Sequence, residues 1–305
     1  MTARADRFET AALMQRAATA SVVVAATLIL AKVAAWVMTD SVAVLSSLLD
    51  SLLDAAASAI NLVAVRHALT PADDEHRFGH GKAEPLAGLA QSAFICGSGL
   101  ILLMEAVHRI GAPQPVQRPE IGIAVAALSI ILSAGLVFYQ RRVVARTGSV
   151  AIAADSLHYG SDALLNLAVV VAIVLGGFLK TPLVDPLSGA LIALWILWGA
   201  IRIARQSFDL LMDRELPADD RSRILAIART RPEVRDVHDL RTRSAGTHIF
   251  VQMHIELDPD MRLARAHAIA DEVEHDIRAA YPHAEIIIHQ DPAGEMEPHR
   301  APVAP

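Results

Sequence analysis

Two pairs of polar residues lie inside long apolar segments of this sequence. Asp50 and Asp54 interrupt the run SLLDSLLDAAASAINLVAV, and His158 and Asp162 interrupt the run that begins at Val150. The members of each pair are four residues apart, so in a helix they share one face. Because a carboxylate at bilayer depth costs about 3 kcal/mol or more, such groups survive where they face a cavity or a partner. These side chains therefore predict a polar site inside a helical bundle.

The residue types in the two pairs suit a metal ion. Three carboxylates and one imidazole would supply four ligands, the number that tetrahedral Zn²⁺ takes. The imidazole disfavours Mg²⁺ and Ca²⁺, which prefer shells made only of oxygen. The alternative interpretation is that His158 and Asp162 pair only to avoid lipid. Asp155, three residues before His158, is either a supporting group or a residue near the interface.

A second polar cluster follows the segment that holds Asp50 and Asp54. The loop PADDEHRFGHGKAEP contains Asp73, His76 and His80, which are spaced for one turn or a tight loop. Imidazole and carboxylate groups both ligate zinc, so these residues predict a second metal site. A solvated, charged loop is the alternative.

The composition is that of a membrane protein. Of 305 residues, 53% are hydrophobic and 20% are charged, which is too apolar for an ordinary soluble domain. The net charge of −6 disfavours nucleic acid as a partner, and the single cysteine, Cys96, excludes a disulfide framework. The N-terminus has no cleavable signal pattern and reads as a cytoplasmic lead-in. Apolar segments that approach or reach spanning length lie at 17–38, 41–65, 85–107, 121–139, 150–179 and 182–201.

Basic residues predict the orientation of these spans, because lysine and arginine concentrate in cytoplasmic loops. One side has only Arg109, Arg118 and Lys180. Both termini are therefore expected in the cytoplasm. The basic residues of the other side are Arg4, Arg7, Arg16, Arg66, Arg77, Lys82, Arg141, Arg142, Arg146, Arg202 and Arg205.

From about residue 208 the sequence changes to that of a soluble domain. Strands are expected at 235–243, 247–257 and 284–289, and helices at 218–230 and 261–280. The order α-β-β-α-β predicts a small α+β sandwich with its helices on one face of the sheet. The strand at 247–257 alternates, which places His254 on its mostly polar face. The predicted domains are a transmembrane domain at 1–207, a cytoplasmic metal-binding domain at 208–292 and a disordered Pro-rich tail at 293–305.

Several motifs of this sequence, taken together, resemble those of a known protein family. SLLDSLLD, PADDEHRFGHGKAEP, ADSLHYGSD, VHDLRTR and IIIHQDP, spread over residues 16–292, resemble the cation diffusion facilitator family and its bacterial zinc and ferrous-iron efflux pumps. The resemblance implies a polytopic α-helical protein of the bacterial cytoplasmic (inner) membrane with six transmembrane helices and a metallochaperone-like cytoplasmic α+β domain. It also implies a homodimer that exchanges metal for protons by alternating access.

The resemblance implies functional residues position by position. Lys82 and Asp213 would form a charge interlock near the membrane surface, and Leu157 a hydrophobic gate. His248 and His275 match no ligand of the family. The implied ligands are Asp50, Asp54, His158 and Asp162 for transport, Asp73, His76 and His80 in the loop, and His238, His254, His267, His289, Gln290 and Asp291 in the cytoplasmic domain.

The expected activity is proton-coupled export of a divalent metal. Zn²⁺ is the first expected ion, as substrate and as structural or regulatory ion, and Cd²⁺ and Fe²⁺ are further substrates. Protons would be the counter-substrate, because imidazole and carboxylate bind metal only when deprotonated and free imidazole titrates near pH 6.5. A passive metal channel and a membrane-anchored metal sensor are the alternatives. A zinc hydrolase is disfavoured because no separate nucleophile or general base presents itself. Expected partners are a second copy, membrane lipid and the metal ions.

Overall fold

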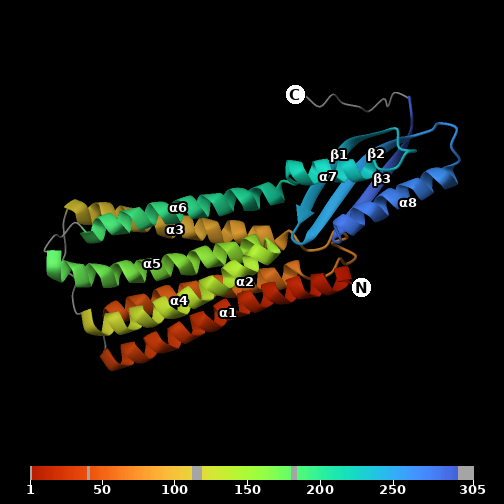
Figure 1. The fold of residues 1–305 in the computed structure, drawn as a ribbon. Helices are drawn as coiled ribbons and strands as arrows, with labels where there is room; N and C mark the ends of the chain where they lie inside the picture. The colour runs from red at the N-terminus through yellow and green to blue at the C-terminus, as the bar shows by residue number, and fades with distance from the viewer. Residues whose placement is uncertain (1, 40–41, 112–118, 180–183, 295–305) are drawn as a thin grey trace. The chain divides into compact units, whose positions relative to one another are not determined.

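The structure, a computed structural model, describes residues 2–39, 42–111, 119–179 and 184–294. The chain divides into two compact units, Thr2–Leu211 and a second that begins at Met212. Helices alone form the first unit, whereas the second combines helices with a sheet (Figure 1). The predicted element order, six long helices followed by α-β-β-α-β, is confirmed. The tail expected to be disordered lies, from residue 295 on, outside the described residues.

Long helices form the first unit. Several extend past the apolar segments, because the flanking Arg, Gln, Glu and Ala residues also favour helix. Among the described residues, five helices are long and apolar enough to cross a membrane, and α5, with 30 residues, is a sixth long helix. The helices are α1 (Thr2–Thr39), α2 (Val42–Ala68), α3 (Ala83–Gly111), α4 (Pro119–Thr147), α5 (Val150–Leu179) and α6 (Val184–Leu211).

Small residues let neighbouring helices approach closely. A side chain added at Gly199 of α6 would place its Cβ 3.0 Å from Leu157 of α5. Likewise, a Cβ at Gly88 of α3 would meet the Ser207 hydroxyl of α6 at 2.7 Å. Close backbone approach of this kind replaces the hydrophobic driving force that is absent between helices in lipid. These contacts hold α6 against α3 and α5.

A buried carboxylate joins four helices of the first unit. Asp155 of α5 is fully buried and accepts hydrogen bonds from Gln140 of α4 at 2.6 Å, Gln91 of α3 at 3.2 Å and the Ser21 hydroxyl of α1. The Tyr159 hydroxyl, one turn along α5, donates to the Ser21 carbonyl at 3.1 Å. Because buried polar groups must find partners, this network fixes the arrangement of the helices. Both roles considered for Asp155, a supporting group and a residue near the membrane interface, stay predictions.

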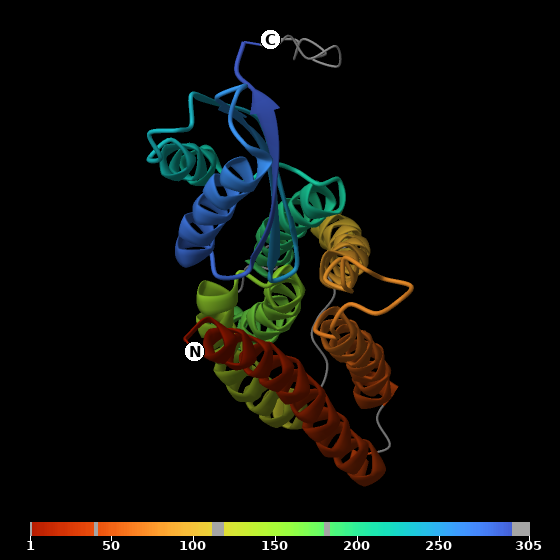
Figure 2. The same cartoon turned by 90° about the vertical axis from the view of Figure 1, so that its right-hand side faces the viewer.

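The second unit is a three-stranded sheet with two helices. Strand β1 (Asp236–Ala245) pairs antiparallel with β2 (His248–Leu257), which pairs parallel with β3 (Ala284–Pro292). Helices α7 (Ala218–Ala228) and α8 (Leu263–Ala280) lie on the same side of the sheet (Figure 2). Gly246, with φ of 60°, turns the chain between β1 and β2. The core lies between sheet and helices and includes Ile224, Val251, Met253, Ile255, Ile269, Val273 and Ile277.

One residue of the expected polar strand face is buried. Phe250 alternates with the core residues of β2 yet is only 6% exposed. The Arg243 guanidinium lies 4.4 Å from the centre of its ring and covers it. The outer face of the sheet is therefore not uniformly polar.

Candidate metal centres

Ligand atoms of α2 and α5 converge inside the helical unit. Oxygen and nitrogen atoms of Asp54, His158 and Asp162 all lie within 4.8 Å of one another. His158 Nε2 is 3.1 Å from Asp54 Oδ1 and 3.7 Å from Asp162 Oδ2. The helical spacing of four residues puts His158 above Asp162, and packing of α2 against α5 brings in Asp54. This arrangement offers one imidazole and two carboxylates to a single ion.

The geometry of this cluster is compatible with a shared ion as well as with a simple pair. The His158 side chain is 8% exposed, and its Nε2 makes no aligned hydrogen bond among the described residues despite the nearby carboxylate. A buried nitrogen without such a bond is costly unless another group completes its surroundings. The ligand atoms of the three side chains are close enough together to bind one ion.

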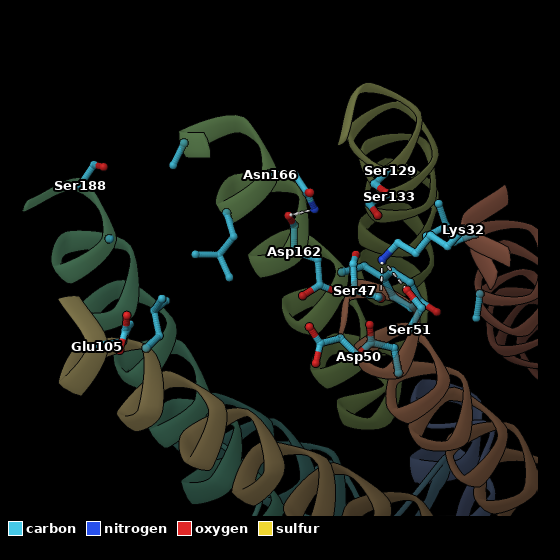
Figure 3. A pocket seen from close by; sticks show the side chains of 18 of the residues that line it. Lys32, Ser47, Asp50, Ser51, Glu105, Ser129, Ser133, Asp162, Asn166 and Ser188 are labelled. Carbon is cyan, nitrogen blue, oxygen red and sulfur yellow. Dashed lines mark hydrogen bonds between the residues drawn. The ribbon is translucent and has the colours of Figure 1, made fainter. Parts of the chain in front are cut away.

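The fourth expected ligand, Asp50, lies farther out. It lines the same cavity, of about 380 Å³, as Asp54 and Asp162, but its oxygens are not in the group within 4.8 Å (Figure 3). Asp50 and Asp162 extend into this cavity from α2 and α5 (Figure 3). The structure thus brings three of the four predicted residues together and keeps the fourth beside them.

Lys32 places a positive charge in the same cavity. Its Nζ donates to the Ser51 hydroxyl at 2.6 Å and to the Ser47 carbonyl at 3.0 Å, both on α2 (Figure 3). These bonds hold the ammonium among carboxylates without placing it on the ligand atoms of the cluster. Lys32 is therefore part of the polar lining of this cavity.

The loop between α2 and α3 gathers its three expected ligands. Asp73 Oδ1 lies 3.3 Å from His76 Nδ1, and Asp73 Oδ2 lies 3.3 Å from His80 Nε2. All three side chains offer atoms within 4.8 Å of one another. His80 is the buried member, with a side chain 6% exposed, whereas Asp73 and His76 are about half exposed, at 53% and 54%.

Backbone hydrogen bonds build this loop. Asp73 Oδ1 accepts from the backbone N–H groups of His76 at 2.6 Å and Glu75 at 3.1 Å, which closes a turn. Gly79, with φ of 77°, then reverses the chain toward His80. The bond from the His76 N–H lowers the pKa of the Asp73 carboxyl, so Asp73 stays ionised at neutral pH and is ready to bind a cation.

The sheet register brings together residues of the cytoplasmic unit. His238 of β1 is opposite His254 of β2, which is opposite His289 of β3. Asp291, two residues beyond His289, lies on the same face and accepts from His254 Nδ1 at 2.9 Å. Its carboxylate is 3.4 Å from His238 Nε2 and 3.1 Å from His289 Nε2. His238, His254 and Asp291 form a group that could hold an ion.

Three other predicted ligands of this unit lie outside that group, namely His289, His267 and Gln290. His267 pairs with Asp271 of its own helix at 3.5 Å, and Gln290 Nε2 donates to the Ile288 carbonyl at 3.3 Å. Conversely, sequence reasoning missed Glu256, whose carboxylate lies 3.6 Å from His238 Nδ1. The signal for it was alternation, since Glu256 shares the outer face with His254 two residues earlier.

The remaining predicted residues have contacts within their own units. Lys82 Nζ donates to the Leu211 carbonyl at 3.3 Å, and Asp213 lies 3.4 Å from Arg243. Leu157 precedes the metal-facing His158 and packs against Gly199. The interlock and gate roles stay predictions.

Sequence comparison gives the family. Residues 18–212 match the cation efflux transmembrane domain, and residues 216–293 match the cation efflux protein cytoplasmic domain. The chain belongs to the cation efflux family. It is accordingly a multi-pass membrane transporter of the cation diffusion facilitator type, and the predicted fold class and family are confirmed.

Similar proteins cover nearly the whole chain. The cation-efflux pump FieF of Shewanella oneidensis is 47% identical over 282 residues, which are 92% of this chain and 95% of that protein. FieF of Cronobacter sakazakii is 45% identical over 280 residues, covering 92% and 93%. Among solved structures, the zinc form of the transporter CzrB is 35% identical, with a TM-score of 0.26, over 28% of this chain and 98% of that chain.

Proposed function

We propose that this cation efflux protein exports Zn²⁺ from the cytoplasm in exchange for protons, by alternating access, and also carries Cd²⁺ and Fe²⁺. The observation that carries the proposal is the convergence of Asp54, His158 and Asp162 in a cavity of the helical unit. A nitrogen and carboxylate oxygens suit these three ions better than Mg²⁺ or Ca²⁺. The curated relatives named FieF are cation-efflux pumps.

Proton exchange follows from the ligand chemistry. A site that must release its ion needs a competitor for the ligands, and protons bind the same imidazole and carboxylate atoms. His158 and Asp162 would take up protons on the acidic side as the metal leaves and lose them before the next ion binds. Alternating exposure of the cavity to the two sides would couple the flows. Asp50, beside the cluster, is the candidate to complete the metal shell during this cycle.

The other two candidate centres would serve assembly and regulation. The loop group of Asp73 would bind metal at the end of α2, and the cytoplasmic group of His254 would bind metal in the second unit. The cytoplasmic family domain supports a homodimer, and His267, exposed on α8, is available to the metal of a second copy. The protein would lie in the bacterial inner membrane with both termini cytoplasmic, as the positions of its basic residues favour.

Reconstitution in liposomes tests this function. The purified chain is placed in vesicles with one internal dye for metal and another for pH, and Zn²⁺, Cd²⁺, Fe²⁺ and Mn²⁺ are added in turn. Zinc uptake should saturate, should move protons in the opposite direction and should be driven by a pH gradient. Asp162→Ala is the control and should abolish both signals.

The result also separates the alternatives. Zinc flux that is independent of a pH gradient and does not saturate would establish a passive channel instead. Binding of zinc without any flux would establish a membrane-anchored sensor.

A further inference from the structure

His67 lies beside the loop centre but belongs to none of the three expected ligand sets. It lies in the last turn of α2, and its carbonyl accepts a hydrogen bond from the Thr70 N–H at 3.0 Å and another from the Thr70 hydroxyl. These bonds fix the backbone at this position. The side chain is exposed, so its imidazole can change rotamer within nanoseconds.

Three imidazoles cluster at this point. The rings of His67 and His80 have centroids 4.5 Å apart and meet edge to face, and the rings of His76 and His80 are also 4.5 Å apart. His80 is central and buried, and its Nδ1 has no hydrogen-bond partner among the described residues. Its other nitrogen faces Asp73 at 3.3 Å. The buried ring therefore links the Asp73 side of the cluster to His67.

The expected loop site has fewer protein ligands than a closed zinc site. Asp73, His76 and His80 supply three, whereas structural zinc sites have four and those with an open position have three plus water. His67 is not in the group whose atoms already lie within 4.8 Å, so its ring must turn to join it. The required movement is a rotation of the exposed His67 side chain, whose ring already packs against that of His80.

From this juxtaposition we infer that His67 is the fourth protein ligand of the loop metal. The inference rests on the proposed loop site and specifies its class: a closed tetrahedral centre of three imidazoles and one carboxylate. Such a shell selects Zn²⁺ or Co²⁺ over Mn²⁺. The charges around the loop permit this coordination. Arg77 pairs with Asp74 at 3.2 Å and not with Asp73, so it does not compete with a metal for the Asp73 carboxylate.

Ligation by His67 would change what the loop metal does. His67 ends α2, and the His80 carbonyl accepts from the Ala83 N–H at 2.9 Å at the start of α3. A bound ion would therefore tie the end of one helix to the beginning of the next. Because α2 also carries Asp54, the loop metal would brace the helix that supplies the transport site.

The competing explanation is structural. A protonated imidazole in the last turn of a helix is stabilised by the helix dipole, and it can pack on His80 without any metal. This explanation predicts that His67→Ala affects stability equally with and without zinc. Ligation predicts an effect that appears only with metal.

The test counts imidazole ligands in the full-length protein. The other two centres are silenced by Asp162→Ala, His254→Ala and Asp291→Ala, and one equivalent of Zn²⁺ is added. X-ray absorption at the zinc edge should report three imidazoles, and His67→Ala should reduce them to two. The same change should weaken zinc binding by at least about tenfold, the lower end of what loss of a supporting group costs a metal site.

Matched variants make the outcomes distinct. His275→Ala, a histidine of α8 in the other unit, should change neither the ligand count nor the affinity. If His67→Ala behaves like His275→Ala while His80→Ala abolishes binding, the loop site exists and the inference about His67 is wrong. If Asp73→Ala and His80→Ala also leave binding unchanged, the proposed loop site itself fails.

Discussion

His158 is the central side chain of the proposed transport site. It is almost fully buried, lies between two carboxylates and lacks an aligned hydrogen bond in the described structure. Removing either carboxylate would leave the imidazole with one charged neighbour instead of two. The individual ligands should therefore differ in importance according to their distance from His158.

Asp54 should matter more than Asp50. Asp54→Asn removes a carboxylate 3.1 Å from His158 Nε2 and should weaken Zn²⁺ affinity by about a hundredfold or more, whereas Asp50→Asn should cost about tenfold. Isothermal titration of detergent-purified variants measures both, with circular dichroism as a control for folding. Equal losses at the two positions would mean that both carboxylates coordinate equally.

Lys32 should weaken metal binding by its charge. Its ammonium shares the cavity with Asp50, Asp54 and Asp162, so it repels an incoming divalent cation. Lys32→Met should raise Zn²⁺ affinity by about tenfold and slow turnover, because release becomes harder. Lys32→Arg keeps the charge and should bind zinc like the parent. Weaker binding in Lys32→Met would contradict this electrostatic role.

At the scale of elements, two features set the helix arrangement. Asp155 joins α1, α3, α4 and α5 by hydrogen bonds, and glycines bring α6 against its neighbours. The first feature is polar and the second steric, so they respond to different substitutions.

Asp155→Ala should destabilise the helical unit more than Asp155→Asn. Alanine leaves the Gln91 amide without its acceptor, at about 1–3 kcal/mol for an unsatisfied group, whereas Gln140 can still donate to the Ser21 hydroxyl. Asparagine keeps one oxygen, and its amide can donate to Gln140 Oε1, which has no partner among the described residues. Thermal unfolding in detergent measures the order, and equal melting temperatures for the two variants would exclude this network as a major stabilising feature.

Gly199→Ala should slow transport through the contact with Leu157. The new Cβ would lie 3.0 Å from the leucine methyl groups, so α6 must shift away from α5 or Leu157 must change rotamer next to His158. Gly97→Ala is the matched control, because a Cβ there meets nothing within 4 Å. Initial zinc flux in vesicles should fall for Gly199→Ala but not for Gly97→Ala. Unchanged flux in Gly199→Ala would show that Leu157 can move away from the new Cβ without affecting transport.

At the scale of the whole molecule, the cytoplasmic metal should hold two copies together. His254 and Asp291, on adjacent strands, belong to the proposed cytoplasmic metal site, and His267 is exposed on α8. Removing metal with a chelator, or introducing His254→Ala, should lower the dimer fraction at low protein concentration, as measured by mass photometry. Re-addition of zinc should restore dimers only in the parent protein. A dimer that is insensitive to both treatments would assign its stability to other contacts.

The sequence by itself determined the elements, because their signals are local. Apolar segments long enough to span lipid predicted the helices, and alternation predicted the strand at 247–257. The spacing of four residues placed Asp50 with Asp54 and His158 with Asp162 on shared helix faces.

Tertiary structure alone decided which of these groups meet. Packing between remote helices put Asp54 beside His158 and left Asp50 outside that cluster, and it buried Asp155 among four helices. Strand register gathered His238 and His254 with Asp291, and the loop turned His80 toward His67. The physical reason is that periodicity states which face a residue occupies, whereas the partner of that face depends on contacts between segments far apart in the chain.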